Sequence, residues 1–496
     1  MYLTTDRQPP NRSRGVRQLH YHLIGIAGTA MASLAGLLKA AGHTVTGSDE
    51  NVYPPMSHEL EALGIPYQSG FAPANLEPRP DIVIVGNAIS RGNVELEAVL
   101  NQKLRYTSAA AVIKEEFIRG RHSLAVSGTH GKTSMSSLLA WVLETAGLNP
   151  AFLIGGVAEN FRRSFRLTDS KYFVIEADEY DTAYFDKGPK MWHYLPDTAI
   201  VANIEFDHAD IYRDAIAYNF AFARFINLIP ASGTLVAGWD SPIVRELAAK
   251  SLAPVESFAY SADQAPSADG AHPRWRAANV SFVPAGTTFT VLHDGAEWGA
   301  VESPLAGAFS VRNILAVIAA AESVGADRER VREGLRTYKS VKRRMEVRGE
   351  ARGVTVIDDF AHHPTAIRET IAAARQKYAG RRLVAVYEPR SYTAQLREFE
   401  GAYEAAFAEA DEVILAGLFH PERYAGNALD PGALVERWKK AGKTAAYIPA
   451  VPEIVHTLSG SLRPGDVVLV MSNGGFGGLH EKLLSALGEL PAGKVR

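Results

Sequence analysis

The residues with the clearest chemical potential form the stretch Ser-Gly-Thr-His-Gly-Lys-Thr-Ser at positions 127–134. Glycines let backbone N–H groups approach phosphate oxygens closely, and the start of a following helix adds partial positive charge. We expect Lys132 to reach the β- and γ-phosphates of a nucleotide, and the Thr133 hydroxyl to bind Mg²⁺. The usual loop has a glycine five residues before Gly131, where this chain has Val126. The stretch is therefore a short variant of the phosphate-binding loop.

The segments on either side of this loop have the patterns that a phosphate-binding loop requires. Residues 124–126 are an apolar run that predicts a strand. After the loop, apolar residues recur at the spacing of an amphipathic helix, at Met135, Leu138, Leu139, Val142 and Leu143. Strand, loop and helix in this order favour a nucleotide site over the alternative, an ordinary turn with a surface lysine.

Polar side chains follow two further predicted strands. Residues 172–175 are apolar and lead into Glu-Ala-Asp-Glu-Tyr-Asp. Carboxylates this close together repel one another unless a cation offsets the charge, although a solvated acidic turn is the alternative. A second strand over residues 199–203 leads into Asn-Ile-Glu-Phe-Asp-His. His208, which follows this strand beside Asp207, is either a metal ligand or a structural histidine.

The region before the loop has the pattern of a nucleotide-binding βαβ unit. A strand, a glycine turn, a helix and a second strand follow one another over residues 20–49, and Asp49 stands 24 positions after Gly25. Such an acidic residue is typical of dinucleotide-binding sheets, but Met31 replaces the third glycine of their fingerprint. A plain structural turn is the alternative. A dehydrogenase, which this region alone allows, is disfavoured by the phosphate-binding loop farther on.

The region after residue 338 alternates strands and helices without a phosphate-binding loop, which predicts a second doubly wound sheet. Its strands are expected at residues 354–358, 383–387, 412–416, 445–448 and 467–471. Earlier in the chain, residues 255–303 contain alternating apolar runs and an Asp294-Gly295 turn. We interpret them as peripheral hairpins.

Together these patterns predict an α/β protein with three domains. A length of 496 residues agrees with this number at ~150 residues per domain. We expect a flexible tail at residues 1–18, a Rossmann-like domain at 19–121, a central P-loop ATPase domain at 122–338, and a Rossmann-like C-terminal domain at 339–496.

The composition is that of an ordinary soluble globular enzyme, with 47% apolar and 22% charged residues. The net charge of -3 argues against nucleic acid as a partner, and the lack of cysteine excludes disulfides and thiolate metal sites. No apolar run approaches the roughly 20 residues that cross a bilayer. The N-terminus contains arginines but lacks the hydrophobic stretch of a signal peptide. We therefore expect a cytoplasmic enzyme without a membrane partner.

Four motifs, in this order, resemble those of the ATP-dependent Mur ligases of peptidoglycan synthesis. They are the loop Gly-Thr-His-Gly-Lys-Thr, then Glu-Ala-Asp-Glu, Asn-Ile-Glu-Phe-Asp-His, and Asp-Asp-Phe-Ala-His-His-Pro at residues 358–364. The resemblance extends over nearly the whole chain from residue 20 onward. It implies that the first domain holds a UDP-sugar, that the central domain binds ATP and Mg²⁺, and that the third domain binds an incoming peptide.

The resemblance also implies roles for individual residues. The UDP-sugar would contact Gly25, Gly28, Met31, Ser48, Asp49, Asn87 and Ser90. ATP would contact Gly128, Thr129, His130, Gly131, Lys132, Thr133, Ser134, Asn313, Arg344 and Asp359. Mg²⁺ would be held by Thr133, Glu176 and His208. The catalytic residues would be Lys132, His208, Arg344 and His362.

The peptide site is expected at the end of the predicted strand 383–387. A fixed fork of donors suits carboxylates, so we expect Arg390, with Ser391 beside it, to bind a carboxylate of the peptide. A base must also take the proton of the attacking amine, and the residue types do not rank His208 against His362 for this role.

Four segments resemble one branch of the family, at residues 51–57, 86–93, 387–391 and 471–478. This branch joins the tripeptide L-Ala-γ-D-Glu-meso-diaminopimelate to UDP-N-acetylmuramate through an acyl phosphate, in peptidoglycan recycling. The first alternative is the branch that adds L-alanine to the same sugar nucleotide. The second is an ATP-dependent switch that ligates nothing. The oligomeric state is not predicted.

Two features depart from the family pattern. The His-Asn pair that commonly precedes the adenine-flanking helix is Phe309-Ser310 here, and only Asn313 matches. No lysine lies between His208 and Lys250, so the carbamylated lysine of several Mur ligases is absent. This second departure fits the branches that act directly on UDP-N-acetylmuramate.

Overall fold

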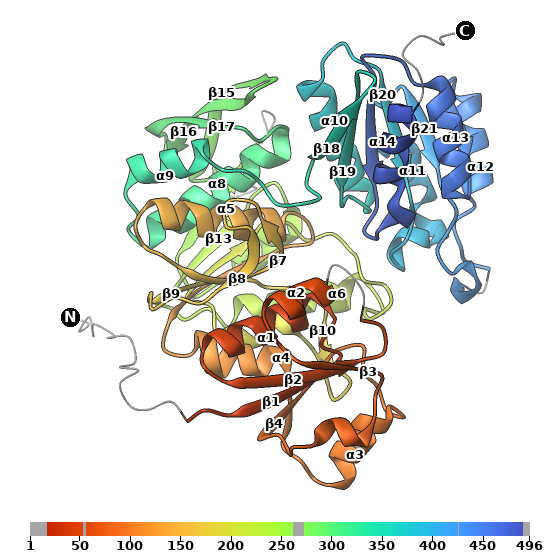
Figure 1. The fold of residues 1–496 in the computed structure, drawn as a ribbon. Helices are drawn as coiled ribbons and strands as arrows, with labels where there is room; N and C mark the ends of the chain where they lie inside the picture. Colours follow the sequence, from red (N-terminus) through yellow and green to blue (C-terminus); the bar gives the residue numbers. More distant parts are fainter. Residues whose placement is uncertain (1–16, 53–55, 261–271, 425, 490–496) are drawn as a thin grey trace.

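The computed structural model describes residues 17–52, 56–260, 272–424 and 426–489, and these form three α/β parts, each with its own large sheet (Figure 1). The predicted fold class is thereby confirmed. The expected tail at residues 1–18 lies almost wholly outside the described residues, as do positions 53–55 of the segment 51–57. Within the described residues, no helix is both long and apolar enough to span a bilayer.

The first part is a five-stranded parallel sheet with the strand order β3-β2-β1-β4-β5. The order reverses between β1 and β4, which is where Rossmann-like sheets bind their ligands. Its strands are β1 (His20–Ile24), β2 (Thr44–Asp49), β3 (Tyr67–Ser69), β4 (Ile82–Val85) and β5 (Tyr106–Ser108). Its helices are α1 (Thr29–Ala40), α2 (Met56–Ala62), α3 (Val94–Asn101) and α4 (Ala109–Val112), with the short 3-10 helix η1 (Pro73–Leu76) and the π-helix η2 (Ile113–Ile118).

The central part is a ten-stranded sheet with the order β17-β16-β15-β14-β13-β12-β6-β9-β7-β8. Its strands are β6 (His122–Ser127), β7 (Ala151–Ala158), β8 (Arg163–Arg166), β9 (Tyr172–Glu176), β12 (Thr198–Val201), β13 (Thr234–Gly238), β14 (Val255–Ala259), β15 (Trp275–Val283), β16 (Gly286–His293) and β17 (Ala296–Ser303). Its helices are α5 (Lys132–Thr145), α6 (Ala215–Ile226), α7 (Pro242–Ala248), α8 (Ala308–Ser323), α9 (Arg328–Arg336) and the short η3 (Lys190–His193). A small two-stranded sheet pairs β10 (Asp181–Ala183) with β11 (Asp186–Pro189).

The two faces of this central sheet pack against different partners. Successive residues of a strand point to opposite faces. In β6, Leu124 and Val126 therefore pack with α5 and α8, whereas Ala125 packs with α6 and with residues of the first part. The phosphate-binding loop at the end of β6 is thus held between two buried layers.

The interpretation of residues 255–303 as peripheral hairpins was partly wrong. The strand β14 is an interior member of the central sheet and pairs in parallel with both β13 and β15. Phe258 and Trp275, which are almost fully buried, fix this pairing because burial of large apolar side chains is strongly favourable. The strands β15 to β17 then extend the same sheet as an antiparallel meander, with the expected turn at Asp294-Gly295. Residues 261–271 lie outside the described part of the chain.

The C-terminal part is a six-stranded sheet with the order β18-β19-β23-β20-β21-β22, parallel except for β18. Its strands are β18 (Glu346–Ala351), β19 (Val354–Asp359), β20 (Leu383–Tyr387), β21 (Glu412–Leu415), β22 (Thr444–Tyr447) and β23 (Val467–Met471). Its helices are α10 (Pro364–Lys377), α11 (Glu400–Ala406), α12 (Pro431–Lys440), α13 (Val451–Ser461) and α14 (Leu479–Glu489), with the short η4 (Thr393–Gln395), η5 (Arg397–Phe399), η6 (Pro421–Tyr424) and η7 (Phe476–Gly478). All five predicted strands are present within one residue of their expected ends, and the edge strand β18 was not predicted.

Candidate active site

The predicted strand, loop and helix around Lys132 are confirmed. β6 ends at Ser127 and α5 begins at Lys132, with Gly128 at a φ of +135° and Gly131 at a φ of +85°. A Cβ at Gly131 would lie 3.0 Å from the Asn313 side chain, so both the conformation and the space at this position require glycine.

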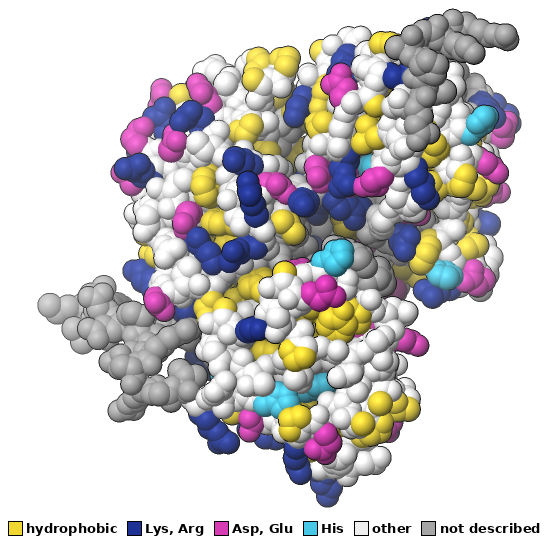
Figure 2. All heavy atoms as spheres, in the orientation of Figure 1, with side chains coloured by type: hydrophobic (Ala, Val, Ile, Leu, Met, Phe, Trp, Pro, Cys, Tyr) yellow, Lys and Arg dark blue, Asp and Glu magenta, His cyan; other side chains and the backbone are white. Residues whose placement is uncertain are grey.

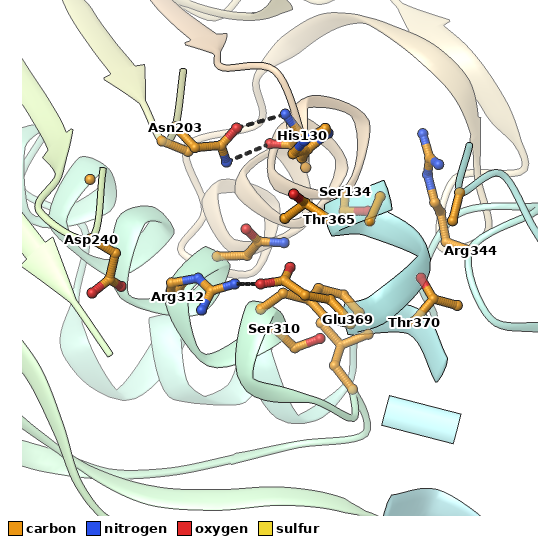
Figure 3. A pocket seen from close by; sticks show the side chains of 18 of the residues that line it. His130, Ser134, Asn203, Asp240, Ser310, Arg312, Arg344, Thr365, Glu369 and Thr370 are labelled. Atoms are coloured by element: carbon orange, nitrogen blue, oxygen red, sulfur yellow. Dashed lines mark hydrogen bonds and ion pairs between the residues drawn. The ribbon is translucent and has the colours of Figure 1, made fainter. Parts of the chain in front are cut away.

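The end of β12 holds this loop in place through Asn203 (Figure 3). The backbone N–H of His130 donates to Asn203 Oδ1 at 2.8 Å, and Asn203 Nδ2 donates to the His130 carbonyl at 3.1 Å. The Thr129 N–H donates to the Asn203 carbonyl at 3.0 Å. The backbone of the loop is therefore held by both the side chain and the backbone of Asn203.

The loop lysine and His208 meet at one buried carboxylate, that of Glu179. Lys132 Nζ donates to Glu179 Oε1 at 2.8 Å and lies 2.7 Å from Oε2. His208 Nε2 lies 3.4 Å from Glu179 Oε1, and the Tyr218 hydroxyl donates to the same oxygen at 3.1 Å. Burial alone would lower the pKa of Lys132, but the charges of Glu179, Asp178 and Glu176 and the hydrogen bond to Glu179 together outweigh burial and raise that pKa.

His208 is held as a cation in this arrangement. Burial would lower its pKa, but the hydrogen bond to Glu179 and the charges of Asp207 and Glu179 outweigh burial and raise that pKa to about 9. Its backbone is also in the left-handed region, with a φ of +57°. A proton on His208 at neutral pH makes this side chain a poor acceptor for a further proton.

Thr133 and Glu176 form the oxygen-rich part of the site. The Thr133 hydroxyl donates to Glu176 Oε1 at 2.9 Å, and the Gly155 N–H donates to Glu176 Oε2 at 2.8 Å. Burial raises the pKa of Glu176. A hydroxyl beside a carboxylate is the type of hard ligand that Mg²⁺ prefers, so these two residues fit this ion. His208 lies against Glu179 instead, and its predicted role as a metal ligand stays a prediction.

Arg344 stands in the linker between the central and C-terminal sheets and extends toward Thr133. Its Nη2 lies 3.4 Å from the Thr133 hydroxyl, and its guanidinium lies 4.8 Å from the centre of the Phe360 ring. Asp359, at the end of β19, accepts hydrogen bonds from the N–H groups of Met345 and Ala361, both at 2.8 Å. The linker thus brings a cation to Thr133 of the phosphate-binding loop, and the Asp359 carboxylate of β19 holds the backbone of Met345 beside that cation.

These elements enclose a cavity of about 370 Å³ between the central and C-terminal parts. Of the predicted ATP residues, it is lined by His130, Gly131, Ser134, Asn313, Arg344 and Asp359. Phe309 and Ser310, which replace the family's His-Asn pair, line it as well. So do Arg312 of α8 and Glu369 of α10, whose ion pair spans the two parts (Figure 3).

The predicted UDP-sugar residues divide into two groups. Gly25 and Gly28 form the turn before α1, and the Asp49 carboxylate supports this turn by accepting the Ala27 N–H at 2.9 Å. Ser48 points inward instead, because its hydroxyl donates to buried Glu95 at 2.7 Å.

The remaining predicted contacts to the sugar also differ in exposure. Met31 is buried, whereas Ser90 is exposed. Asn87 Nδ2 donates to Asp181 Oδ1 of the central part at 2.9 Å. A ligand can therefore reach the glycine turn, Asn87 and Ser90 more easily than it can reach the buried Met31 and Ser48.

The C-terminal part places His362 on the side that faces the central part. His362 Nε2 lies 3.8 Å from Asp207 Oδ2, and the hydroxyls of Tyr387 and Tyr403 donate to the His362 carbonyl at 2.8 and 3.1 Å. This places His362 at the boundary between the two parts and fixes its backbone.

Arg390 lies in an aromatic and acidic environment. Its guanidinium lies 3.9 Å above the Phe419 ring, and its Nη1 is 3.7 Å from Glu388 Oε1. The neighbouring Ser391 hydroxyl accepts the Ala394 N–H at 3.2 Å and so stabilises a local turn. Arg390 is the better placed of the two to contact a peptide.

Sequence reasoning missed five residues of this region: Asn203, Glu205, Arg312, His363 and Glu369. Asn203, Glu205 and His363 stand inside the strand-end motifs, so their polar types at such positions could have identified them. Arg312 and Glu369 lie on helices of different parts, 57 positions apart, and no local pattern connects them.

Comparisons with known proteins agree with this geometry. Three family models match successive regions: the Mur ligase family catalytic domain at residues 20–119, the Mur ligase middle domain at 126–321, and the Mur ligase glutamate ligase domain at 343–474. The UDP-N-acetylmuramate–L-alanyl-γ-D-glutamyl-meso-2,6-diaminoheptandioate ligase of Escherichia coli (strain K12) is 41% identical over 470 residues, which cover 95% of this chain and 98% of that protein.

Two further relatives are similar to this chain over more than nine-tenths of its length. A crystal structure of a murein peptide ligase from Psychrobacter arcticus 273-4 has a TM-score of 0.71 and 35% identity, and covers 95% of this chain and 99% of that one. The UDP-N-acetylmuramate–L-alanine ligase of Roseiflexus sp. (strain RS-1) is 34% identical over 464 residues, which cover 92% of this chain and 96% of that protein. With these similarities and the geometry above, the chain belongs to the Mur ligase family.

Proposed function

We propose that this protein is an ATP-dependent ligase that joins the tripeptide L-Ala-γ-D-Glu-meso-diaminopimelate to UDP-N-acetylmuramate. The observation that carries the proposal is the contact of Arg344, which lines the cavity between the central and C-terminal parts, with Thr133 of the phosphate-binding loop. Thr133 in turn donates to Glu176, and Lys132 precedes it in the same loop. The identity to the Escherichia coli relative, whose name specifies this reaction, supports the choice of substrates. Since ATP and UDP-sugars are cytoplasmic metabolites, we place the activity in the cytoplasm.

The first step activates a carboxylate, which does not react with an amine at neutral pH by itself. The lactyl carboxylate of UDP-N-acetylmuramate attacks the γ-phosphate of ATP and gives an acyl phosphate and ADP. Lys132 and Arg344 would neutralise charge on the transferred phosphoryl group. Thr133 and Glu176 would hold Mg²⁺, which supplies further charge neutralisation at the phosphate oxygens.

The second step is attack of the L-Ala amine on the carbonyl carbon of the acyl phosphate. The amide bond forms, the bond to the phosphate oxygen breaks and inorganic phosphate leaves, and a base must accept the amine proton. We favour His362 for this role, because it lies at the boundary between the two parts and 3.8 Å from the Asp207 carboxylate. His208 is already charged through Glu179 and Asp207. A carboxylate that faces a histidine supports the imidazolium form once the proton has been taken.

Arg390 is our candidate for recognition of a peptide carboxylate. Its stem and guanidinium are supported by the Phe419 ring, and Glu388 only partly occupies its donors. We expect Arg390→Ala to raise the KM for the tripeptide by ten- to a hundredfold, equal to about 1.4–2.7 kcal/mol of lost binding, with a smaller effect on kcat. An unchanged KM for the tripeptide would show that Arg390 does not bind its carboxylate.

The decisive experiment measures ADP release and product mass with UDP-N-acetylmuramate, ATP and Mg²⁺, and offers either L-alanine or the tripeptide. Turnover with the tripeptide alone is the expected result. Turnover with L-alanine alone would assign the protein to the activity named for the Roseiflexus relative. A lack of product with both amines would favour a nucleotide-dependent switch.

A further inference from the structure

Two histidines and a glutamate converge where the phosphate-binding loop meets the C-terminal part. They are His130 of the loop, Glu205 after β12, and His363 at the start of α10. His130 Nε2 lies 3.0 Å from Glu205 Oε2, and His363 Nδ1 lies 3.5 Å from the same oxygen. All three potential ligand atoms lie within 4.8 Å of one another. The group draws on three separate segments of the chain and on both sides of the cavity.

This group differs from the oxygen ligands that fit Mg²⁺. Thr133 and Glu176 offer a hydroxyl and a carboxylate, whereas the new group offers two imidazoles and one carboxylate. Mg²⁺ takes oxygen ligands, while imidazole nitrogens favour Zn²⁺ and neighbouring transition metals. Two histidines and one glutamate are also a known ligand set of zinc sites with three protein ligands and one open position.

The spacing is close to what such a metal needs. In a tetrahedral site with bonds of ~2.0–2.1 Å, the ligand atoms lie about 3.3 Å apart. The two distances to Glu205 Oε2, 3.0 and 3.5 Å, bracket this value. The gap between the two imidazoles is the wider one, and rotation of the partly exposed His130 ring can close it.

Coordination needs a charged carboxylate and neutral imidazoles, so the metal replaces any proton on the two histidines and its binding weakens as pH falls. The Nδ1 lone pair of His363 accepts the Thr365 N–H at 3.3 Å, and coordination through this nitrogen replaces that hydrogen bond.

We propose that His130, Glu205 and His363 form a binding site for a borderline transition-metal ion such as Zn²⁺, separate from the Mg²⁺ ligands. Because His130 and Glu205 also line the cavity, the metal competes there with the nucleotide. Because His363 belongs to the C-terminal part, the metal also links that part to the central one. This inference does not depend on which amine the enzyme ligates.

The first test is titration of the nucleotide-free full chain with ZnCl₂ by calorimetry, in buffer with millimolar Mg²⁺. We expect a Zn²⁺ site that millimolar Mg²⁺ does not displace and that becomes at least tenfold weaker in Glu205→Gln and in His363→Asn. His363 is the N-cap of α10, and asparagine is a good N-cap, so His363→Asn removes the imidazole while it preserves the helix start.

His420→Asn is the matched control, since His420 is an exposed histidine paired with Glu422 elsewhere in the C-terminal part. Its Zn²⁺ affinity should equal that of the unaltered protein. An equal loss in His420→Asn, or no loss in His363→Asn, would overturn the site. Circular dichroism of each variant identifies any loss of folding, and the crystallographic test below then decides with the unaltered chain alone.

The second test is anomalous scattering at the zinc edge from crystals of the full chain soaked in ZnCl₂. The expected peak lies between the His130, Glu205 and His363 side chains, and saturating ADP should weaken Zn²⁺ binding at least tenfold in the calorimeter. A peak only beside His208 and Glu179, or only beside His193 and Asp186, would refute the proposed ligands. Zn²⁺ affinity unaltered by ADP would refute the competition.

Discussion

The central part meets its two neighbours through contacts of different kinds. Toward the first part the contact is apolar and close: a single buried cluster contains residues of both, and Phe165 packs so tightly on α1 that a Cβ at Gly36 would lie 2.1 Å from its ring. The hydroxyls of Ser33 and Ser164, both buried, meet at 2.8 Å across the same contact. Such close packing resists displacement, because even small changes in volume are costly.

Toward the C-terminal part the contact is mainly polar, although a Cβ at Gly307 would lie 2.7 Å from that of Ala373. Arg312 pairs with Glu369, and the Ala209 N–H donates to the Thr393 hydroxyl at 3.0 Å. Among the described residues, the buried apolar clusters of the C-terminal part contain none of the central one. Charged side chains of both signs surround the hollow between these two parts (Figure 2). The difference places the cavity, our candidate for the ATP site, at the contact whose stability depends on charge, where salt, pH or a ligand can alter it.

Arg344→Ala should cause the largest loss of activity, because it removes the cation that crosses the polar contact to reach Thr133. An arginine that stabilises phosphoryl transfer contributes about 10³-fold or more, so we expect kcat for ADP formation to fall by roughly that factor. The free energy of unfolding should change by less than about 0.5 kcal/mol. Arg336→Ala, at an exposed arginine of α9, is the control and should leave kcat unchanged. A kcat within tenfold of the original would remove Arg344 from the phosphate site.

Phe165→Ala should show the opposite pattern, with a large loss in the free energy of unfolding and a small change in kcat. Removing a buried phenylalanine costs about 3–5 kcal/mol, and we expect this loss in the free energy of unfolding measured with urea. The kcat of the folded enzyme should change far less than in Arg344→Ala. Phe220→Ala, at an exposed phenylalanine of α6, should cost less than about 0.5 kcal/mol. Equal losses at Phe165 and Phe220 would contradict the apolar contact.

The pH dependence of stability should depend on the polar contact through His363. Its pKa is about 4 in the folded protein against an ordinary value of 6.5. Between these values the unfolded chain binds a proton that the folded chain does not, so the free energy of unfolding should fall as pH drops through this range, by about 3 kcal/mol at most. His363→Asn should reduce this fall, as measured by urea unfolding at pH 7 and pH 4.5. Identical pH slopes would show that His363 does not titrate in this way.

Glu369→Gln should cause the smallest change, a modest rise in the KM for ATP, because the Arg312–Glu369 pair is partly exposed. Such pairs contribute about 1 kcal/mol or less, which corresponds to at most a fivefold rise in the KM for ATP. Added salt should raise the KM of the unaltered enzyme and affect the variant less, since the variant has already lost the pair. The comparison is a set of KM measurements from 50 to 500 mM NaCl. A variant with the same salt dependence would mean that the pair does not contribute to the contact.

The sequence predicted those features that depend on local patterns. The loop around Lys132, the βαβ unit over residues 20–49, the five parallel strands of the C-terminal sheet and the polar strand ends all follow from periodicity and from glycine at fixed places. It missed β18 because this edge strand, Glu-Val-Arg-Gly-Glu-Ala, mixes charged residues with glycine and is largely exposed. Exposed edge strands need no apolar alternation, and they often carry charges.

The site was predicted less completely than the fold. Ser48 illustrates the reason: the family resemblance implies a contact with the sugar nucleotide, but its hydroxyl donates to buried Glu95 on α3, 47 positions away. A buried carboxylate is costly unless it accepts hydrogen bonds. The Ser48 hydroxyl supplies one of these bonds to Glu95, and the sequence near Ser48 does not reveal this tertiary contact. The Arg312–Glu369 pair is also a tertiary contact that spacing along the chain does not reveal.

The buried cluster shared by the first and central parts has a consequence for how the chain can be divided. A cut near residue 121 would split that cluster and expose apolar surface on both fragments, whereas a cut in the linker near residue 340 would leave each fragment with complete clusters. By this criterion the three sheets amount to two folding units. We expect residues 17–338 to be obtained as one stable fragment, and the C-terminal sheet as another.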